Sequence, residues 1–136
     1  MELWDTTGQG KHRAMAPICF RRAAAAPILF DGTVVKSFDE LEAVWLPELL
    51  PHMKYSTEFI VVCGNKCDAV ATDGQREGVH HAEEVCRARG LAFLHTSARN
   101  GQNVHGAFGA LVDSLLTRRE EEAAMVPDAP VVQGPQ

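Results

Sequence analysis

FIVVCGNKCD, from Phe59 to Asp68, joins an unbroken apolar run to a polar loop. A short apolar run that ends at turn-forming residues is typical of a strand buried on both faces of a parallel sheet. Similar runs lie at Pro27 to Phe30 and at Leu91 to Leu94, and Leu3-Trp4 could close one more strand. The sequence therefore predicts short parallel strands with polar residues at their carboxyl ends.

Amphipathic stretches separate these runs. Ser37 to Glu40 matches a capping box, in which a Ser hydroxyl and a Glu carboxylate bind free amides at the start of a helix. Pro47 follows within the same helical pattern, and because an interior proline costs about 3 kcal/mol or more, we expect a kink or an end near Leu46. The expected apolar stripe of this helix is Phe38, Leu41, Val44, Trp45 and Leu49.

Two further helices are predicted downstream. One runs from Glu77 to Arg89, with His81, Val85 and Ala88 on one side and Gly90 as a left-handed C-cap. The other runs from Asn103 to Arg119 and is N-capped by Asn103. Strands that alternate with helices predict an α/β fold with a doubly wound, mostly parallel sheet.

The chain divides into two expected parts. Residues 1–119 form one domain, and residues 120–136 form an acidic, proline-containing tail that we expect to be disordered because its apolar periodicity is lost.

Composition narrows the function classes. The 136 residues carry a formal net charge of -5, which argues against nucleic acid because phosphate neutralisation needs a basic face. The four cysteines lack metal-ligand spacing, so buried reduced thiols are favoured over a metal site. Without a signal peptide, a spanning apolar run or a C-terminal cysteine for prenylation, we expect a cytoplasmic protein with no direct membrane anchor, whose contact with endomembranes is made through partners.

The loop NKCD, Asn65 to Asp68, has the residues to read a purine. The Asp68 carboxylate can accept two parallel hydrogen bonds from N1-H and the exocyclic amine of guanine, a pattern that adenine does not offer. Asn65 can offer its amide to the base or to a neighbouring loop, and the aliphatic stem of Lys66 can lie over the ring. The alternative interpretation is an ordinary Asn/Asp-rich turn after a strand.

A second loop, TSAR at Thr96 to Arg99, favours the base-reading interpretation. It lies one helix and one strand downstream, and it supplies a Ser97 hydroxyl to hold Asp68 and an Ala98 N–H to meet the guanine oxygen. Since the carboxyl ends of parallel strands share one edge of a sheet, the two loops are expected to meet.

A third string, WDTTGQ at Trp4 to Gln9, adds phosphate chemistry. Asp5 is placed for a water-mediated Mg²⁺ contact, the Gly8 N–H could approach a terminal phosphate, and Gln9 would orient the attacking water. The alternative is a strand followed by a tight turn.

These strings resemble a small GTPase of the Ras superfamily, most like the Rab family. WDTTGQ resembles that family's WDTAGQE, FRRAAAAPILFDGT its YYRGAAAAIVVYDIT, and NKCD with TSAR its base-binding pair. The resemblance implies a P-loop small-GTPase fold, GTP or GDP with Mg²⁺, Rab-type effectors or regulators, and a role in vesicle traffic. It also implies Gln9 as catalytic residue, Asp5 toward the metal, and nucleotide contacts from Gly8, Asn65, Lys66, Asp68, Ser97, Ala98 and Arg99.

The phosphate-binding motif G-x-x-x-x-G-K-[ST] does not occur in these residues. Set against the family's pattern, the chain lacks the first two strands, the first helix and the first switch, so we expect weak or absent Mg²⁺ binding and negligible hydrolysis. Three alternatives stay open: a Rab-type GTPase represented by a truncated sequence, a pseudo-GTPase that binds partners without nucleotide turnover, and a non-functional product.

Overall fold

The computed structural model describes residues 2–6, 16–21, 23–53 and 57–125. Its centre is a three-stranded parallel sheet in the order β1-β2-β3, made of β1 (Ala26–Asp31), β2 (Ile60–Asn65) and β3 (Ala92–His95). The three apolar runs at these positions are thereby confirmed as strands, and so is the mostly parallel α/β architecture.

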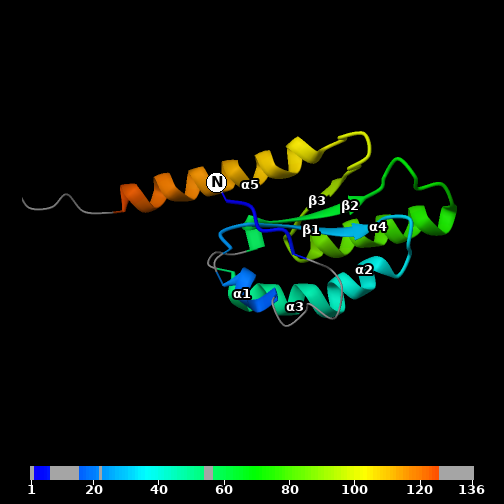
Figure 1. The fold of residues 1–136 in the computed structure, drawn as a ribbon, viewed down its shortest axis with the longest axis horizontal. Helices are drawn as coiled ribbons and strands as arrows, with labels where there is room; N and C mark the ends of the chain where they lie inside the picture. The colour runs from blue at the N-terminus through cyan, green and yellow to red at the C-terminus, as the bar shows by residue number, and fades with distance from the viewer. Residues whose placement is uncertain (1, 7–15, 22, 54–56, 126–136) are drawn as a thin grey trace, which may run out of the picture.

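Helices cover both faces of the sheet (Figure 1). On one side lie α2 (Ser37–Glu40), the π-helical turn η2 (Leu41–Trp45), α3 (Leu46–Leu49) and α4 (Asp73–Ala88), and on the other lies α5 (Val104–Ala124). The short elements α1 (Ala16–Phe20), η3 (Leu50–His52) and η4 (Thr57–Phe59) complete the order.

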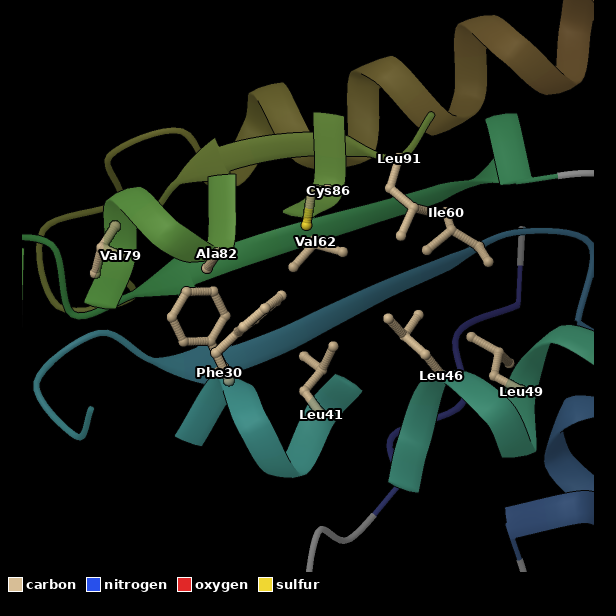
Figure 2. Packing of buried hydrophobic residues seen from close by; sticks show 11 residues of the cluster. Phe30, Leu41, Leu46, Leu49, Ile60, Val62, Val79, Ala82, Cys86 and Leu91 are labelled. Carbon is tan, nitrogen blue, oxygen red and sulfur yellow. The ribbon is translucent and has the colours of Figure 1, made fainter. Parts of the chain in front are cut away.

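The side-chain alternation of β2 builds two cores. Ile60 and Val62 face α2, α3 and α4, where they join the main buried cluster shown in Figure 2. Val61 and Cys63 face α5 and pack with Ala107 and Leu111. β2 is thus buried on both faces, as its unbroken apolar run predicted.

The expected first strand is wrong. Residues 2–6 form neither a strand nor a helix and lie outside the sheet, with Leu3 and Trp4 exposed at 65% and 62%. Residues 7–15, which include Gly8 and Gln9, lie outside the described part of the chain.

Of the two outcomes expected at Pro47, a kink or a helix end near Leu46, the helix end is wrong. The helix continues through Pro47 because it widens to a π turn just before it, where the Leu46 N–H donates to the Leu41 carbonyl, five residues back. A π turn absorbs the backbone disruption that proline causes in a regular helix.

The predicted capping box at Ser37 is also wrong. Lys36 is the N-cap of α2 without a side-chain bond, and the Ser37 hydroxyl instead accepts the Asp31 N–H at 2.9 Å. Asn103 is the N-cap of α5, as predicted, but its backbone is left-handed (φ 56°) and its side-chain amide donates to the His95 carbonyl, so the cap has no side-chain hydrogen bond.

Helix α4 starts earlier than predicted. Thr72 and Gln75 form a capping box, which sets the first turn at Asp73. The buried face is Val79, Ala82 and Cys86. Of the three residues predicted to share one side, Val85 is half-buried, and His81 and Ala88 are exposed.

The C-terminal ends of the two long helices, α4 and α5, can be compared with their predicted positions. Gly90 has φ +69°, which confirms the predicted left-handed C-cap of α4. Helix α5 reaches Ala124, so residues 120–124 of the predicted tail are helical, and residues 126–136 lie outside the described part.

Candidate functional site

The carboxyl ends of the three strands form one rim. Parallel pairing puts Asp31 opposite Asn65 and Gly64 opposite His95, so the loops after β1, β2 and β3 leave the sheet side by side. The backbone ties the last two loops together, since the Cys67 N–H donates to the Thr96 carbonyl at 3.0 Å. The predicted meeting of the NKCD and TSAR loops is therefore present.

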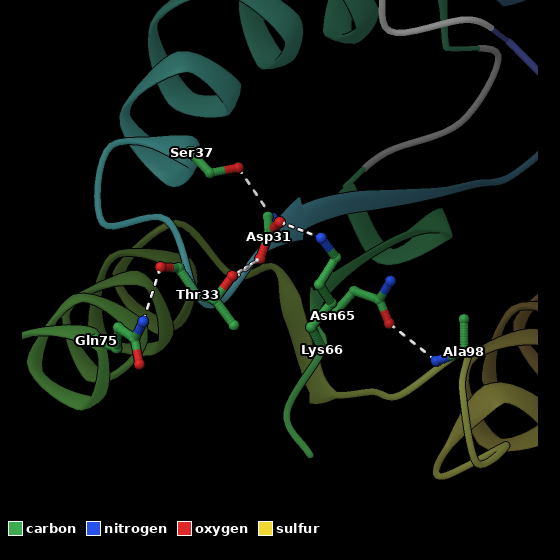
Figure 3. A network of polar contacts seen from close by, with 7 residues as sticks. All are labelled: Asp31, Thr33, Ser37, Asn65, Lys66, Gln75 and Ala98. Atoms are coloured by element: carbon green, nitrogen blue, oxygen red, sulfur yellow. Dashed lines mark hydrogen bonds and ion pairs between the residues drawn. The ribbon is translucent and has the colours of Figure 1, made fainter. Parts of the chain in front are cut away.

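Asn65 bridges the two loops with its side-chain oxygen. Its Oδ1 accepts the Ala98 N–H at 3.1 Å, as Figure 3 shows, and a long bond from the Thr96 hydroxyl at 3.4 Å. The Ala98 N–H is thus engaged within the chain, whereas the sequence predicted it to point at a ligand oxygen. A ligand acceptor at this position has to share that N–H with Asn65 or displace its oxygen.

Asp68 is fixed by a buried hydroxyl. Ser97 Oγ donates to Asp68 Oδ1 at 2.6 Å, and Ser97 is fully buried. The hydroxyl oxygen in turn accepts a long bond from the Asn100 N–H at 3.4 Å. A hydroxyl held from both sides fixes the orientation of the carboxylate, and Asp68 Oδ2 lies 4.0 Å from Arg99 Nη1 in a loose ion pair.

Lys66 makes a contact that the sequence did not reveal. Its backbone is left-handed (φ 62°), and its Nζ lies 2.6 Å from Asp31 Oδ2 (Figure 3). The other oxygen of Asp31 accepts the Thr33 N–H and hydroxyl at 2.9 and 2.6 Å. Burial would raise the pKa of Asp31, but the bonds from Lys66 and Thr33 outweigh it and hold that pKa below its ordinary value of 3.8.

Asp31 is accordingly the rim residue whose role sequence reasoning missed. Its position after a strand was visible, but its two partners were not. The sequence showed only that an acidic residue, Asp31, follows one predicted strand and that Lys66 follows another.

The phosphate-side residues are less completely described. Asp5 is exposed, and Gly8 and Gln9 lie outside the described residues. Within the described ranges, no group of three or more His, Cys, Asp or Glu side chains gathers to hold a metal ion.

A hollow of about 450 Å³ lies beside the rim on the α4 side. Its lining includes Gly64, Cys67, Val79 and His95, and it contains neither Asn65 nor Asp68. The residues predicted to read the base thus lie on the rim and outside this hollow.

The sequence is similar to those of known proteins. The profile described as Ras family matches residues 1–117. The chain belongs to the Ras family. Within it, the relatives described below are named as Rab proteins, which agrees with the resemblance that the motifs indicated.

Three relatives illustrate the range. Ras-related protein Rab-27A of Rattus norvegicus is 34% identical over 120 residues, which are 88% of this chain and 53% of the relative. Ras-related protein Rab11A of Lotus japonicus is 36% identical over 115 residues, 84% of this chain and 49% of the relative. Ras-related protein Rab-26 of Bos taurus is 34% identical over 118 residues, 87% and 44%. The chain therefore spans about half the length of the relatives it matches.

Of the helices in the described ranges, none is both long and apolar enough to cross a bilayer.

Proposed function

We propose that this chain binds guanine nucleotides as a Rab-like protein of vesicle traffic, and that the rim formed by Asn65, Lys66, Asp68, Ser97, Ala98 and Arg99 reads the guanine base. The observation that carries the proposal is the hydrogen bond from buried Ser97 to Asp68. It orients a carboxylate at the carboxyl edge of a parallel sheet, where ligands of such sheets bind.

The chemistry at Asp68 favours guanine over adenine. A carboxylate accepts from N1-H and the exocyclic amine of guanine, and each hydrogen bond to a charged group is worth about 1.5 to 3 kcal/mol. Adenine has an acceptor at N1, so it would leave the carboxylate unpaired. The side-chain amide nitrogen of Asn65, which points away from Ala98 in Figure 3, is a further donor for the base.

Turnover is the weaker part of the proposed activity. Phosphoryl transfer depends on positioned phosphate-binding groups, and the 136 residues contain no G-x-x-x-x-G-K-[ST] loop. Asp5, Gly8 and Gln9 are proposed to act on the phosphate side, with Gln9 positioning water. For these residues on their own, we propose guanine binding with impaired or absent hydrolysis.

The proposal includes partners and location. Rab-type effectors or regulators would bind the protein, which would act in the cytoplasm and reach endomembranes through them. These assignments rest on the relatives, all described as Rab proteins.

The test exchanges the base-reading carboxylate for an amide. Asp68→Asn should bind GDP at least tenfold more weakly and gain affinity for xanthosine diphosphate, whose C2 carbonyl accepts from the new amide. Asp113→Asn, on the exposed side of α5, is the matched control because it makes the same charge change away from the rim. Equal GDP affinity for all three proteins would overturn the assignment of Asp68.

A second candidate, a pseudo-GTPase interaction module without turnover, is favoured by one observation. The Ala98 N–H already donates to Asn65, so the rim satisfies one of its own base-facing donors. In that case a folded, monodisperse chain would show no thermal shift with millimolar GDP and Mg²⁺. A shift that grows with GDP concentration would rule out an interaction module that does not bind nucleotide.

A further inference from the structure

The side chain of Lys66 is tethered at both ends. At its base the residue has the left-handed φ of 62°, which a non-glycine residue adopts only when surrounding contacts hold it. The Lys66 carbonyl accepts the Ala69 N–H at 2.9 Å, which is one such contact. At its tip the ammonium lies 2.6 Å from Asp31 Oδ2. The methylene chain therefore spans from the end of β2 to the end of β1.

The anchor at the tip is itself fixed without help from Lys66. Asp31 Oδ1 accepts two bonds from Thr33, the Asp31 N–H donates to the Ser37 hydroxyl, and the Thr33 carbonyl accepts the Gln75 amide at 3.0 Å. These contacts join β1 to the starts of α2 and α4, as Figure 3 shows. A carboxylate held in this way is a rigid partner for a flexible ammonium.

The tethered stem is open to a ligand. The side chain of Lys66 is 56% exposed, while that of Asp31 is 25% exposed. More than half of the Lys66 side-chain surface is thus open to solvent although its ammonium is paired with Asp31 at the edge of the sheet. An exposed aliphatic stem of fixed position is a surface on which a flat ring can stack.

We propose that Asp31 is a positioning residue for the base site: its ion pair holds the Lys66 stem in place as one wall for a purine ring. This inference rests on the proposed guanine-binding function. Asp31 does not read the edge of the base, so it raises affinity for purine nucleotides without setting the preference among them. Preorganising one long side chain is worth about a two- to tenfold gain in affinity, because the ligand no longer orders it.

The test is a double-mutant cycle on the full chain with GDP and inosine diphosphate, which lacks the exocyclic amine. Asp31→Asn should weaken both ligands by the same factor, about two- to tenfold, and leave the GDP preference unchanged. Lys66→Met keeps the aliphatic stem without the charge, and in that background Asp31→Asn should have no further effect. Glu42→Gln, which breaks the ion pair with Arg89 away from the rim, is the matched control and should bind as the unmodified chain does.

A measurement that needs no ligand distinguishes the proposed effect of Asp31→Asn from misfolding of the variant. The Lys66 methylene NMR shifts should differ from free-lysine values in the unmodified chain and return to them in Asp31→Asn. Free-lysine shifts in the unmodified chain, an equal loss from Asp31→Asn in the Lys66→Met background, or a changed GDP preference would each overturn the inference. If the unmodified chain binds no GDP, both the proposed function and this inference are wrong. If it binds GDP and Asp31→Asn leaves the affinity unchanged, only this inference is wrong.

Discussion

Ser97 and Asp68, 29 residues apart in the chain, are joined by a 2.6 Å hydrogen bond that locks the loop after β3 to the loop after β2. Ser97 is fully buried, and the side chain of Asp68 is 19% exposed. The pair connects the interior of the protein to a carboxylate at the surface. Changes at Ser97 should therefore be felt both in stability and in ligand binding.

Ser97→Ala should lower the free energy of unfolding by about 1 to 3 kcal/mol, because it leaves Asp68 Oδ1 and the Asn100 N–H without their partner. GDP affinity should fall as well, since the carboxylate loses its orientation. Urea unfolding and a GDP titration measure the two effects. Ser114→Ala is the control: its hydroxyl only bonds the Ala110 carbonyl within α5, and its effect should stay within about 0.5 kcal/mol. Equal stability losses in the two variants would contradict the structural role of Ser97.

The Asp31 carboxylate should make the free energy of unfolding depend on pH in the acid range. Its pKa is lowered in the folded chain, so the charged form stabilises the fold; this contribution is fully present above the ordinary value of 3.8 and is lost as pH falls through the folded pKa. Asp31→Asn should therefore flatten the decline in stability below about pH 4. Urea midpoints measured from pH 2 to pH 6 would show it, and an unchanged slope in the variant would remove Asp31 as the source.

The cysteines should separate by reactivity. Burial raises the pKa of Cys63 and of Cys86 to about 11, so both thiols stay protonated at pH 8. Cys67 is half-buried in the rim loop and lines the hollow beside it. Alkylation of the native chain followed by mass spectrometry should modify Cys67 well before Cys63 and Cys86. Simultaneous labelling of all three would mean that the sheet opens on the timescale of the reaction.

Two glycines should respond in opposite directions to alanine. A Cβ at Gly32 would lie 2.9 Å from the Asn65 carbonyl oxygen and 3.2 Å from Val70, so Gly32→Ala should cost about 1 to 3 kcal/mol through a shift of the rim. A Cβ at Gly109, in the second turn of α5, would have nothing within 4 Å. Gly109→Ala should therefore stabilise the chain by up to about 1 kcal/mol. Thermal unfolding measures both effects. A stabilising Gly32→Ala would contradict the close contacts that a Cβ at this position would make with Asn65 and Val70.

The sequence predicted the parts of the fold that depend on local pattern. The runs that became β1, β2 and β3 are apolar stretches bounded by turn residues, and Gly90 ends α4 with the backbone that glycine favours. The start of α4 was also readable, because Thr72-x-x-Gln75 is a capping box in the sequence. Overlooking that signal placed the helix start several residues too late.

Other features depend on which residues meet in space. Ser37 matched a capping pattern, yet its hydroxyl is taken by the Asp31 N–H once β1 and α2 are folded together. Lys66 and Asp31 are 35 residues apart, and only the register of β1 on β2 brings them to one edge. The engagement of the Ala98 N–H by Asn65 has the same origin. Local pattern therefore located the rim, and the tertiary register decided its internal bonds.

The most direct test of guanine recognition is an NMR titration of the 136-residue chain with GDP and, separately, with ADP. The account predicts that GDP shifts the backbone amides of Asn65 to Asp68 and Thr96 to Arg99 in a saturable manner, and that ADP at the same concentrations does not. Equal perturbation by both nucleotides, or GDP-induced shifts confined to other surfaces, would contradict the claim that this rim reads guanine.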